Sequence, residues 1–299
     1  MILRVLAPAK LNLFLHIIGR RADGYHLLQS VFTLLDFGDS LIIESRSDGV
    51  IVRTNELAGV PAETDLVVRA ANLLQQHADG LSGCNTGREM GCNIHVEKRI
   101  PMGGGLGGGS SDAAAVLLGL NKLWGLSLAA TELQQLGRRL GADVPFFVNG
   151  HSAFAEGTGE ILTNIMLPEW WFIVLTPPEV VPTPLIFSAP ELTRDTIPLK
   201  IADFSASGFA NLINCRNDLQ PVVLKAFPVV ASYLSALQAV SAKAVFGARM
   251  TGSGACVFAA FEFERDAHDA LNKLTPEYQG FVACGMNRHS LCSVADTAC

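Results

Sequence analysis

The feature that most constrains the fold is a glycine tract, Pro101-Met-Gly-Gly-Gly-Leu-Gly-Gly-Gly-Ser-Ser-Asp112. Before it, Cys92–Lys98 alternates apolar and polar residues as a β-strand does. After it, apolar residues recur at helical spacing: Ala113, Leu117, Leu120 and Trp124. Glycines permit positive φ angles and carry no Cβ, so successive backbone N–H groups can converge on an oxyanion at the start of the helix. The tract therefore predicts a strand, a phosphate-binding loop and a helix in succession.

Other interpretations of the tract are less favoured. A flexible linker would not be inserted between a strand and an amphipathic helix. Gly103, Gly105 and Gly108 match the dinucleotide spacing G-x-G-x-x-G, but a tract so rich in glycine satisfies almost any spacing. No acidic residue sits ~20 positions further on to bind a ribose. The lysine of a Walker A loop and the H-R-D and D-F-G motifs of protein kinases are also missing from the sequence.

Length and composition indicate a folded protein of two domains. The 299 residues are 49% apolar and 17% charged, far from the composition of a disordered chain. Residues 167–184 contain a short apolar segment and then several prolines, which continue neither a helix nor a sheet. We predict a domain change just before this segment, giving an N-terminal ATP-binding domain at 1–160 and a C-terminal domain at 161–299.

Charge and cysteine content exclude several classes of protein. The net charge of −6 argues against nucleic-acid and anionic-membrane partners, so an anionic substrate must be held by a local site. No segment approaches the ~20 apolar residues that cross a bilayer. Seven cysteines are scattered without a C-x-x-C pair, which favours a reducing cytoplasm over a disulfide or zinc framework. They are Cys84, Cys92, Cys215, Cys256, Cys284, Cys292 and Cys299.

The remaining patterns predict an α+β fold. Val5–Ile18 has Leu11, Leu13, Leu15 and Ile17 on one face and Asn12 and His16 on the other, as in a half-buried strand. Further predicted strands are Ser40–Glu44, Val50–Arg53, Ser152–Ala155, Trp171–Leu175, Ala255–Phe261 and Gly280–Ala283. Further predicted helices are Leu66–Gln76, Pro228–Val240 and Arg265–Lys273.

Three segments together resemble the motifs of the GHMP kinase superfamily, which includes galactokinase, homoserine kinase and mevalonate kinase. They are PAKLNLFL (Pro8–Leu15), PMGGGLGGGSSDAA and TGSGACVF (Thr251–Phe258). The resemblance implies a two-domain architecture with ATP in the interdomain cleft. A closer resemblance, to the kinases of one branch of this superfamily that serves non-mevalonate isoprenoid biosynthesis, is carried by PAKLNLFL, RADGYHLLQS, LGADVPFFVNGHSAFAEGTGE and VPTPLIF. The resemblance implies that the protein uses ATP to phosphorylate a cytidine diphosphate-linked polyol, at the 2-hydroxyl of its erythritol part.

Lys10 and Asp143 are the predicted catalytic residues. Lys10 is expected at the head of the first strand, and Asp143 on a turn between Gly141, which ends a helix, and Pro145. The resemblance implies that Asp143 orients and deprotonates the acceptor hydroxyl while Lys10 pairs with it. Taken without the resemblance, each would more often be a solvated surface charge.

The resemblance also implies the binding residues. The loop would bind ATP through Pro101, Met102, Gly103, Gly104, Gly105, Leu106, Gly107, Gly108, Gly109, Ser110 and Ser111. Asp65, Leu66, Lys98 and Met102 would line the adenosine pocket. Tyr25 and Phe187 would stack on cytosine while His26 contacts the base edge, and Asn12, Thr183, Gly252 and Ser253 would contact the acceptor. Ser110 and Ser111 fit a plain helix cap as well as phosphate or Mg²⁺ binding, and the metal ligands stay open.

Two alternatives remain at this point. One is a sibling kinase acting on a mevalonate- or homoserine-type alcohol, and the other is a non-catalytic nucleotide-binding module. Lys10 and Asp143 argue against the second, because binding of ATP alone requires neither. The oligomeric state is left open, with a homodimer as the candidate.

Overall fold

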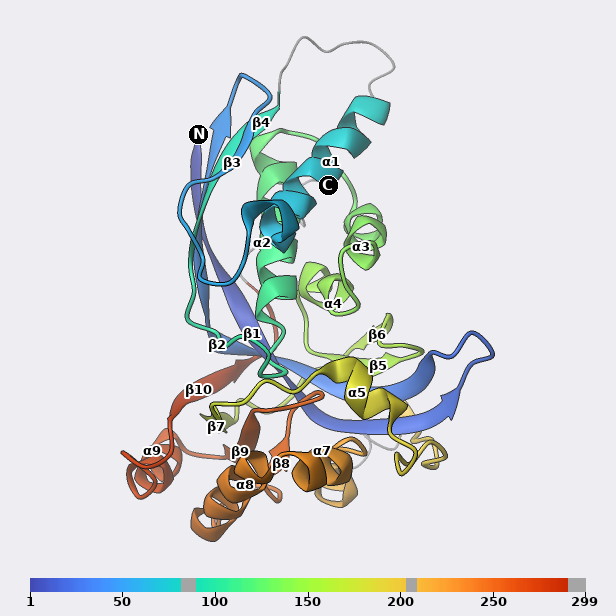
Figure 1. Cartoon of the computed structure of the whole chain (residues 1–299), viewed down its shortest axis with the longest axis vertical. Coiled ribbons are helices and arrows are strands. Elements are labelled where there is room, and N and C mark those ends of the chain that lie inside the picture. The colour runs from blue at the N-terminus through green and yellow to red at the C-terminus, as the bar shows by residue number, and fades with distance from the viewer. Residues whose placement is uncertain (82–89, 203–208, 290–299) are drawn as a thin grey trace.

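Two long antiparallel strands organise the molecule. The computed structural model describes residues 1–81, 90–202 and 209–289. Strand β1 (Ile2–Arg20) pairs along its length with β2 (His26–Arg46). This hairpin descends from the upper part of the molecule into the lower part, where it bends beneath β5 and β6 (Figure 1). The two strands therefore contribute to both halves of the structure.

The remaining strands extend the hairpin into a mixed sheet. Its order is β3-β4-β2-β10-β7-β9-β8, with β1 and β5 also paired to β2 and β6 paired to β5. Strands β3 and β4 are parallel, and the other pairs are antiparallel. The bounds are β3 Ile51–Arg53, β4 Gly91–Glu97, β5 Ala153–Glu156, β6 Ile161–Asn164, β7 Trp171–Leu175, β8 Arg249–Met250, β9 Val257–Phe261 and β10 Gly280–Met286.

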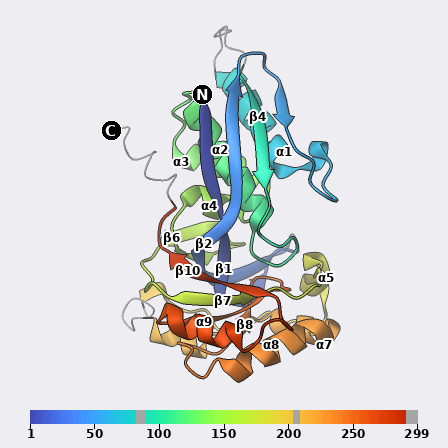
Figure 2. The same ribbon diagram turned by 90° about the vertical axis from the view of Figure 1, so that its left-hand side faces the viewer.

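The helices form two groups. Helices α1 to α4 lie behind the upper strands, and α7 to α9 lie below β7 and β10, as Figure 2 shows. Their bounds are α1 Leu66–Leu81, α2 Gly108–Leu123, α3 Ala130–Arg138, α4 Val144–Asn149, α5 Thr183–Ser188, α7 Gln220–Ala226, α8 Pro228–Val240 and α9 Glu264–Asn272.

Three apolar clusters hold these layers together. One packs the upper strands against α1 to α4, and a second packs β7 and β9 against α7 to α9. The third, which we call the shared core, joins β1 to the lower strands. Its members include Ala9, Leu11, Leu13 and Phe14 of β1, Phe172 and Val174 of β7, and Phe258 and Ala260 of β9. The domain division near residue 160 stays a prediction.

The structure confirms the α+β class and most of the predicted elements, but β1 is more buried than predicted. Leu11, Asn12 and His16 are all at least 95% buried, because layers pack on both faces of the strand. The prediction that Leu11, Leu13, Leu15 and Ile17 share one face of this strand was also wrong. A register shift between Asn12 and Leu15 places Leu15 with Lys10 and Asn12 along the same cavity, whereas Leu13 stays in the shared core.

Short elements that begin with proline were missed. The prolines of 167–184 were expected to exclude regular structure, yet Pro184 lies in the first turn of α5. Pro145 and Pro221 occupy the same place in α4 and α7. The first turn of a helix has no intrahelical acceptor for its N–H groups, so proline costs nothing there. The strands β6 and β8 were also missed.

In the described part of the chain, no single helix is long and apolar enough to span a bilayer; α7 and α8 meet the length and composition test only as a pair bent by 118°. Cys92, Cys215, Cys256 and Cys284 are free thiols. Cys84, Cys292 and Cys299 lie outside the described residues.

Candidate active site

A cavity of about 330 Å³ lies where the hairpin, the glycine loop and the lower part of the molecule meet. Segments far apart in the sequence contribute to its wall. Many residues predicted from the sequence line it: Lys10, Asn12, Gly103, Gly105, Gly107, Ser110, Asp143, Thr183, Phe187, Gly252 and Ser253. This cavity is the candidate active site.

Lys10 and Asp143 are the ionic pair of the cavity. The Nζ atom of Lys10 lies 3.5 Å from Oδ2 of Asp143 and donates a hydrogen bond of 2.5 Å to Oδ1 of Asn12. Lys10 is 4% exposed and sits mid-way along β1, so its predicted place at the head of the strand was wrong. Strand β1 begins at Ile2, because the residues from Ile2 to Pro8 already pair with β2 before Lys10 is reached. The side chain of Asp143 remains 36% exposed and accessible to a substrate.

Asn12 is held from several directions. Its backbone N–H donates to Oγ1 of Thr251 at 2.9 Å, and its Nδ2 donates to Oγ of Ser30, also at 2.9 Å. Ser30 in turn donates to the carbonyl of Phe14 at 2.6 Å. Because both amide ends of Asn12 are engaged, it fixes the position of the Lys10 ammonium.

Asp143 occupies a different local structure from the one predicted. It is the N-cap residue of α4, and Pro145 lies in the first turn of that helix instead of fixing a turn before it. Gly141 is not the C′ residue of α3, since α3 ends at Arg138 and Gly141 lacks the positive φ of such a cap. The side chain of Asp143 does not cap α4, so its carboxylate stays available to the cavity.

Close backbone packing explains the glycine loop. Gly103, Gly105 and Gly107 have φ angles of 72°, 78° and 74°. A Cβ atom at Gly105 would lie 2.5 Å from the carbonyl oxygen of Thr251. Two backbone bonds anchor the loop: Lys10 N to Leu106 O at 3.0 Å and Cys256 N to Gly104 O at 3.1 Å. The loop is thus seated on β1 and on the turn that precedes β9.

The two serines after the loop differ in position. The N-cap of α2 is Gly107, so neither serine is the cap considered from the sequence. Ser110 lines the cavity, and its Oγ would lie 3.5 Å from a Cβ placed on Gly141. Ser111 is 1% exposed and its hydroxyl has no hydrogen-bond partner among the described residues. Ser110 is therefore the serine placed to meet a ligand.

A second hollow of about 300 Å³ lies on the other side of the loop, where an adenosine pocket was expected. Leu66, Lys98 and Met102 line it together with the glycines. Asp65 does not, because its carboxylate pairs with Arg53 at 2.6 Å and accepts from the N–H of Val67 at the start of α1. The structure thus places three of the four expected adenosine residues together.

Lys98 joins the strand before the loop to the helix after it. Its ammonium donates to Oδ2 of Asp39 and, at 2.7 Å, to Oδ2 of Asp112. Asp39 also accepts from the N–H groups of Arg99 and Ile100, at 2.6 and 2.8 Å. Burial lowers the pKa of Lys98, but the charges of Asp112 and Asp39 outweigh burial and raise it. The ammonium therefore stays charged.

The predicted base-binding residues are partly assembled. The rings of His26 and Phe187 lie with centroids 5.1 Å apart, and Phe187 lines the cavity. Thr183 hydrogen-bonds Ser253 at 2.6 Å across the same wall. Tyr25 lies on the turn between β1 and β2, is 66% exposed and does not line the cavity.

Several site residues were not predicted. Leu28, Ala142, Thr158 and Gly159 also line the cavity, and Asp39 and Asp112 hold Lys98. Asp112 had a recognisable pattern, because it is a charged residue within the apolar stripe of α2. Asp39 had no recognisable sequence pattern, because only the pairing of β2 with β4 brings it close to Lys98.

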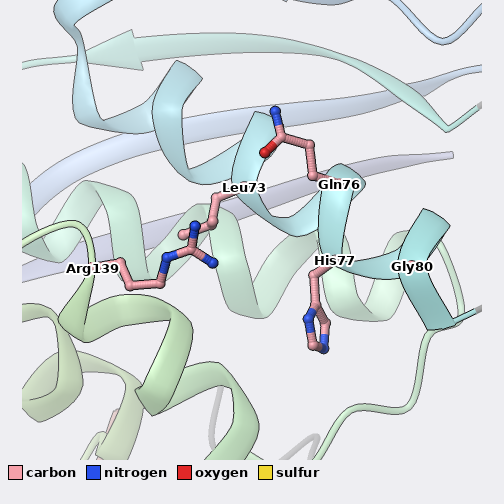
Figure 3. Close-up of a pocket in the computed structure, with 5 residues that line it drawn as sticks. All are labelled: Leu73, Gln76, His77, Gly80 and Arg139. Atoms are coloured by element: carbon pink, nitrogen blue, oxygen red, sulfur yellow. The ribbon is translucent and has the colours of Figure 1, made fainter.

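Another cavity, of about 300 Å³, lies between α1 and the end of α3 (Figure 3). It is lined by Leu73, Gln76, His77, Gly80 and Arg139. No segment of the glycine loop or of β1 reaches it, so it contains neither Lys10 nor Asp143 and is separate from the candidate active site.

Comparison with known proteins identifies the family of this chain. Residues 65–151 match the N-terminal domain of GHMP kinases, and residues 200–279 match the C-terminal domain. The chain is 54% identical over 286 residues to 4-diphosphocytidyl-2-C-methyl-D-erythritol kinase of Janthinobacterium sp. (strain Marseille), covering 95% of each chain. It is 56% identical to the kinase of the same name from Thiobacillus denitrificans, covering 95% of this chain and 96% of that one. The chain belongs to the 4-diphosphocytidyl-2-C-methyl-D-erythritol kinases, a branch of the GHMP kinase family.

Solved structures support the same assignment. A crystal structure of 4-(cytidine 5'-diphospho)-2C-methyl-D-erythritol kinase superimposes with a TM-score of 0.79 at 34% identity, covering 95% of this chain and 99% of that chain. Homoserine kinase from Cytophaga hutchinsonii shares the fold at 17% identity, with a TM-score of 0.66. As a GHMP kinase, the protein is an ATP-dependent small-molecule kinase, and the glycine loop is the part of the fold suited to the phosphates of ATP.

Proposed function

We propose that the protein transfers the γ-phosphoryl group of ATP to the 2-hydroxyl of 4-diphosphocytidyl-2-C-methyl-D-erythritol. The observation that carries the proposal is the single cavity in which Lys10 and Asp143 lie beside the glycine loop. The name shared by relatives at more than 50% identity favours this acceptor over mevalonate or homoserine. The same relatives support a role in non-mevalonate isoprenoid biosynthesis, and a cytoplasmic location stays a prediction. A homodimer stays a prediction.

In the proposed reaction, the acceptor oxygen bonds to the γ-phosphorus as the bond from that phosphorus to the β–γ bridging oxygen breaks. ADP leaves, and the hydroxyl proton passes to the carboxylate of Asp143. A carboxylate is a weak base towards an alcohol, so this proton transfer accompanies or follows P–O bond formation. Asp143 then acts chiefly by orienting the hydroxyl, which suits a loose transition state.

Lys10 and the loop have complementary roles in this proposal. Lys10 offsets the negative charge of Asp143 when the phosphates of ATP approach, and Asn12 keeps its ammonium in place. The N–H groups of the glycine loop, together with the start of α2, receive the phosphate oxygens.

We propose that Mg²⁺ accompanies ATP. Within residues 1–81, 90–202 and 209–289, no three His, Cys, Asp or Glu side chains gather into a metal cage. The oxygen donors of Ser110 and Asp143 fit a hard cation that keeps water and phosphate oxygens as its other ligands. Bound Mg²⁺ would neutralise charge on the phosphates. Removal of Mg²⁺ with EDTA should abolish turnover, and added Mg²⁺ should restore it.

The acceptor is tested directly by supplying Mg-ATP with three candidate alcohols and recording phosphorus NMR spectra of the products. We expect a new phosphomonoester with the cytidine compound, and at least ~10-fold lower kcat/KM with mevalonate and homoserine, because neither offers a base to the pocket. Equal phosphorylation of mevalonate or homoserine would contradict the proposed acceptor.

A further inference from the structure

Arg194, in the loop after α5, makes an unusual set of hydrogen bonds. Its Nη2 donates to the carbonyls of Ala189 and Phe187 at 2.7 and 3.2 Å, and its Nη1 donates to that of Leu192 at 3.0 Å. Its Nε donates to Nε2 of His26 at 3.1 Å. Arg194 therefore ties the backbone of the segment that carries Phe187 to the imidazole packed against the Phe187 ring.

The last of these bonds determines where the proton of His26 lies. A guanidinium has no acceptor, so Nε2 of His26 must be the unprotonated nitrogen. A neutral imidazole with an acceptor at Nε2 carries its proton on Nδ1. Burial, followed by the positive charges of Arg194 and Arg20, lowers the pKa of His26 and keeps the ring neutral.

The Nδ1–H group remains available for a ligand. Among the described residues, the imidazole of His26 makes one hydrogen bond, at Nε2, and its Nδ1 has no hydrogen-bond partner. The ring is held in place on one side by Phe187, which lines the active-site cavity, and at Nε2 by Arg194. His26 thus offers one fixed donor, beside an aromatic face on which a base can stack.

We propose that Arg194 is the positioning residue that makes the site select cytosine over uracil. Ring nitrogen N3 of cytosine is an acceptor, whereas N3 of uracil carries a hydrogen and is a donor. The Nδ1–H of His26 can donate a hydrogen bond to N3 of cytosine, but it would face the N3–H of uracil, donor against donor. In the other tautomer, Nδ1 would accept, and the preference would be reversed. The inference rests on the proposed function, because it assumes a cytidine-bearing acceptor.

The first test uses the ligand-free protein and needs no substrate. Nitrogen-15 NMR of the imidazole side chains, with His26 assigned by comparison with His26→Gln, distinguishes the two neutral tautomers. We expect Nδ1–H in the wild type and, because free imidazole side chains favour Nε2–H, a shift towards Nε2–H in Arg194→Met. A wild-type spectrum showing Nε2–H would overturn the inference, even if the Arg194→Met variant did not fold.

The second test measures discrimination between acceptors. The kcat/KM of the wild type for the cytidine acceptor should exceed that for its uridine counterpart by ~10-fold or more, since the wrong base leaves a buried donor unpaired. In Arg194→Met this ratio should fall by about the same factor, with most of the change in KM. Arg21→Gln is the matched control, because it removes a positive charge from the neighbouring β1–β2 turn without contacting His26, and it should keep the wild-type ratio.

The outcomes separate the two proposals. If the wild type phosphorylates the cytidine compound but Arg194→Met keeps both the tautomer and the ratio, the role of Arg194 is wrong and the proposed function stands. If the wild type phosphorylates neither nucleotide acceptor, the proposed function is wrong. A loss of discrimination in Arg21→Gln equal to that in Arg194→Met would also overturn the inference, because general charge would then explain the effect.

Discussion

The carboxylate of Asp143 is the group whose chemistry is most directly testable. We expect Asp143→Asn to lower kcat by about 10² to 10⁴, since the amide can still hydrogen-bond the hydroxyl but cannot take its proton. Binding of a non-hydrolysable ATP analogue should change little, because the glycine loop and the N-terminus of α2 are untouched. Steady-state kinetics and calorimetric titration provide the measurements. Asp195→Asn, on an exposed loop, is the control, and wild-type turnover in folded Asp143→Asn would remove Asp143 from the chemistry.

Gly105 is the loop position with the least room. We expect Gly105→Ala to weaken binding of the ATP analogue at least ~10-fold, because the new methyl group meets the carbonyl of Thr251 and the positive φ is unfavourable for alanine. Gly80→Ala adds the same methyl group in open space at the end of α1, and it should bind the analogue normally. Equal affinity of both variants would show that loop geometry does not govern nucleotide binding.

At the scale of elements, the contact between β4 and α2 depends on a buried cluster of two carboxylates and one ammonium. Burial raises the pKa of Asp112 to about 7; Lys98 opposes this shift, and Asp39 reinforces it. Between the ordinary pKa of 3.8 and about 7, the native state therefore holds a proton that the unfolded chain has released. The protein is expected to lose stability as pH rises through this range.

Asp112→Asn should flatten this pH dependence. The wild-type free energy of unfolding should fall between about pH 4 and about pH 7 with a limiting slope on the order of 1.4 kcal/mol per pH unit, and the variant should show a smaller fall. Urea denaturation at several pH values measures both curves. Parallel curves for wild type and Asp112→Asn would assign the pH dependence to other groups.

The sequence was most informative about elements with a strong local pattern. The glycine loop, α2, β7 and α8 lie where periodicity and composition placed them. The three sequence motifs also predicted that one cavity would be lined by Lys10, Asn12 and glycines of the loop. The bulge at Asn12–Leu15, the Asp39–Lys98 pair and the Arg194–His26 bond were not predictable, because each depends on the register or packing of segments distant in sequence. The α4 helix was hidden because Pro145 looks locally like a terminator.

At the scale of the whole molecule, Arg249 links the lower strands to β1. Its guanidinium is 5% exposed, donates at 3.0 Å to the carbonyls of Leu13 and Leu212, and packs over the ring of Phe246. Burial lowers the pKa of Arg249 to about 10, which still leaves it charged near neutral pH. Arg249 thus connects the carbonyl of Leu13, at the register shift of β1, to the carbonyl of Leu212 in the lower part of the molecule.

We expect Arg249→Met to lower the free energy of unfolding by about 2 to 6 kcal/mol, because two buried carbonyls would each lose a donor at ~1 to 3 kcal/mol. Urea denaturation followed by tryptophan fluorescence measures the change. Arg265→Met, on the exposed side of α9, should have an effect below about 0.5 kcal/mol. Equal stability of the two variants would show that Arg249 does not join the layers.

The hairpin of β1 and β2 also limits how such enzymes can exchange parts. A recombination point near residue 160 would bring the hairpin from one parent and β7 to β10 from the other, so the two walls of the shared core would come from different sequences. Leu13 and Phe14 would then meet partners with which they had not co-adapted, directly beneath Lys10 and Asn12. We expect working chimeras to arise instead from exchanges at the periphery, such as the turn between β3 and α1, where neither face of the hairpin is disturbed.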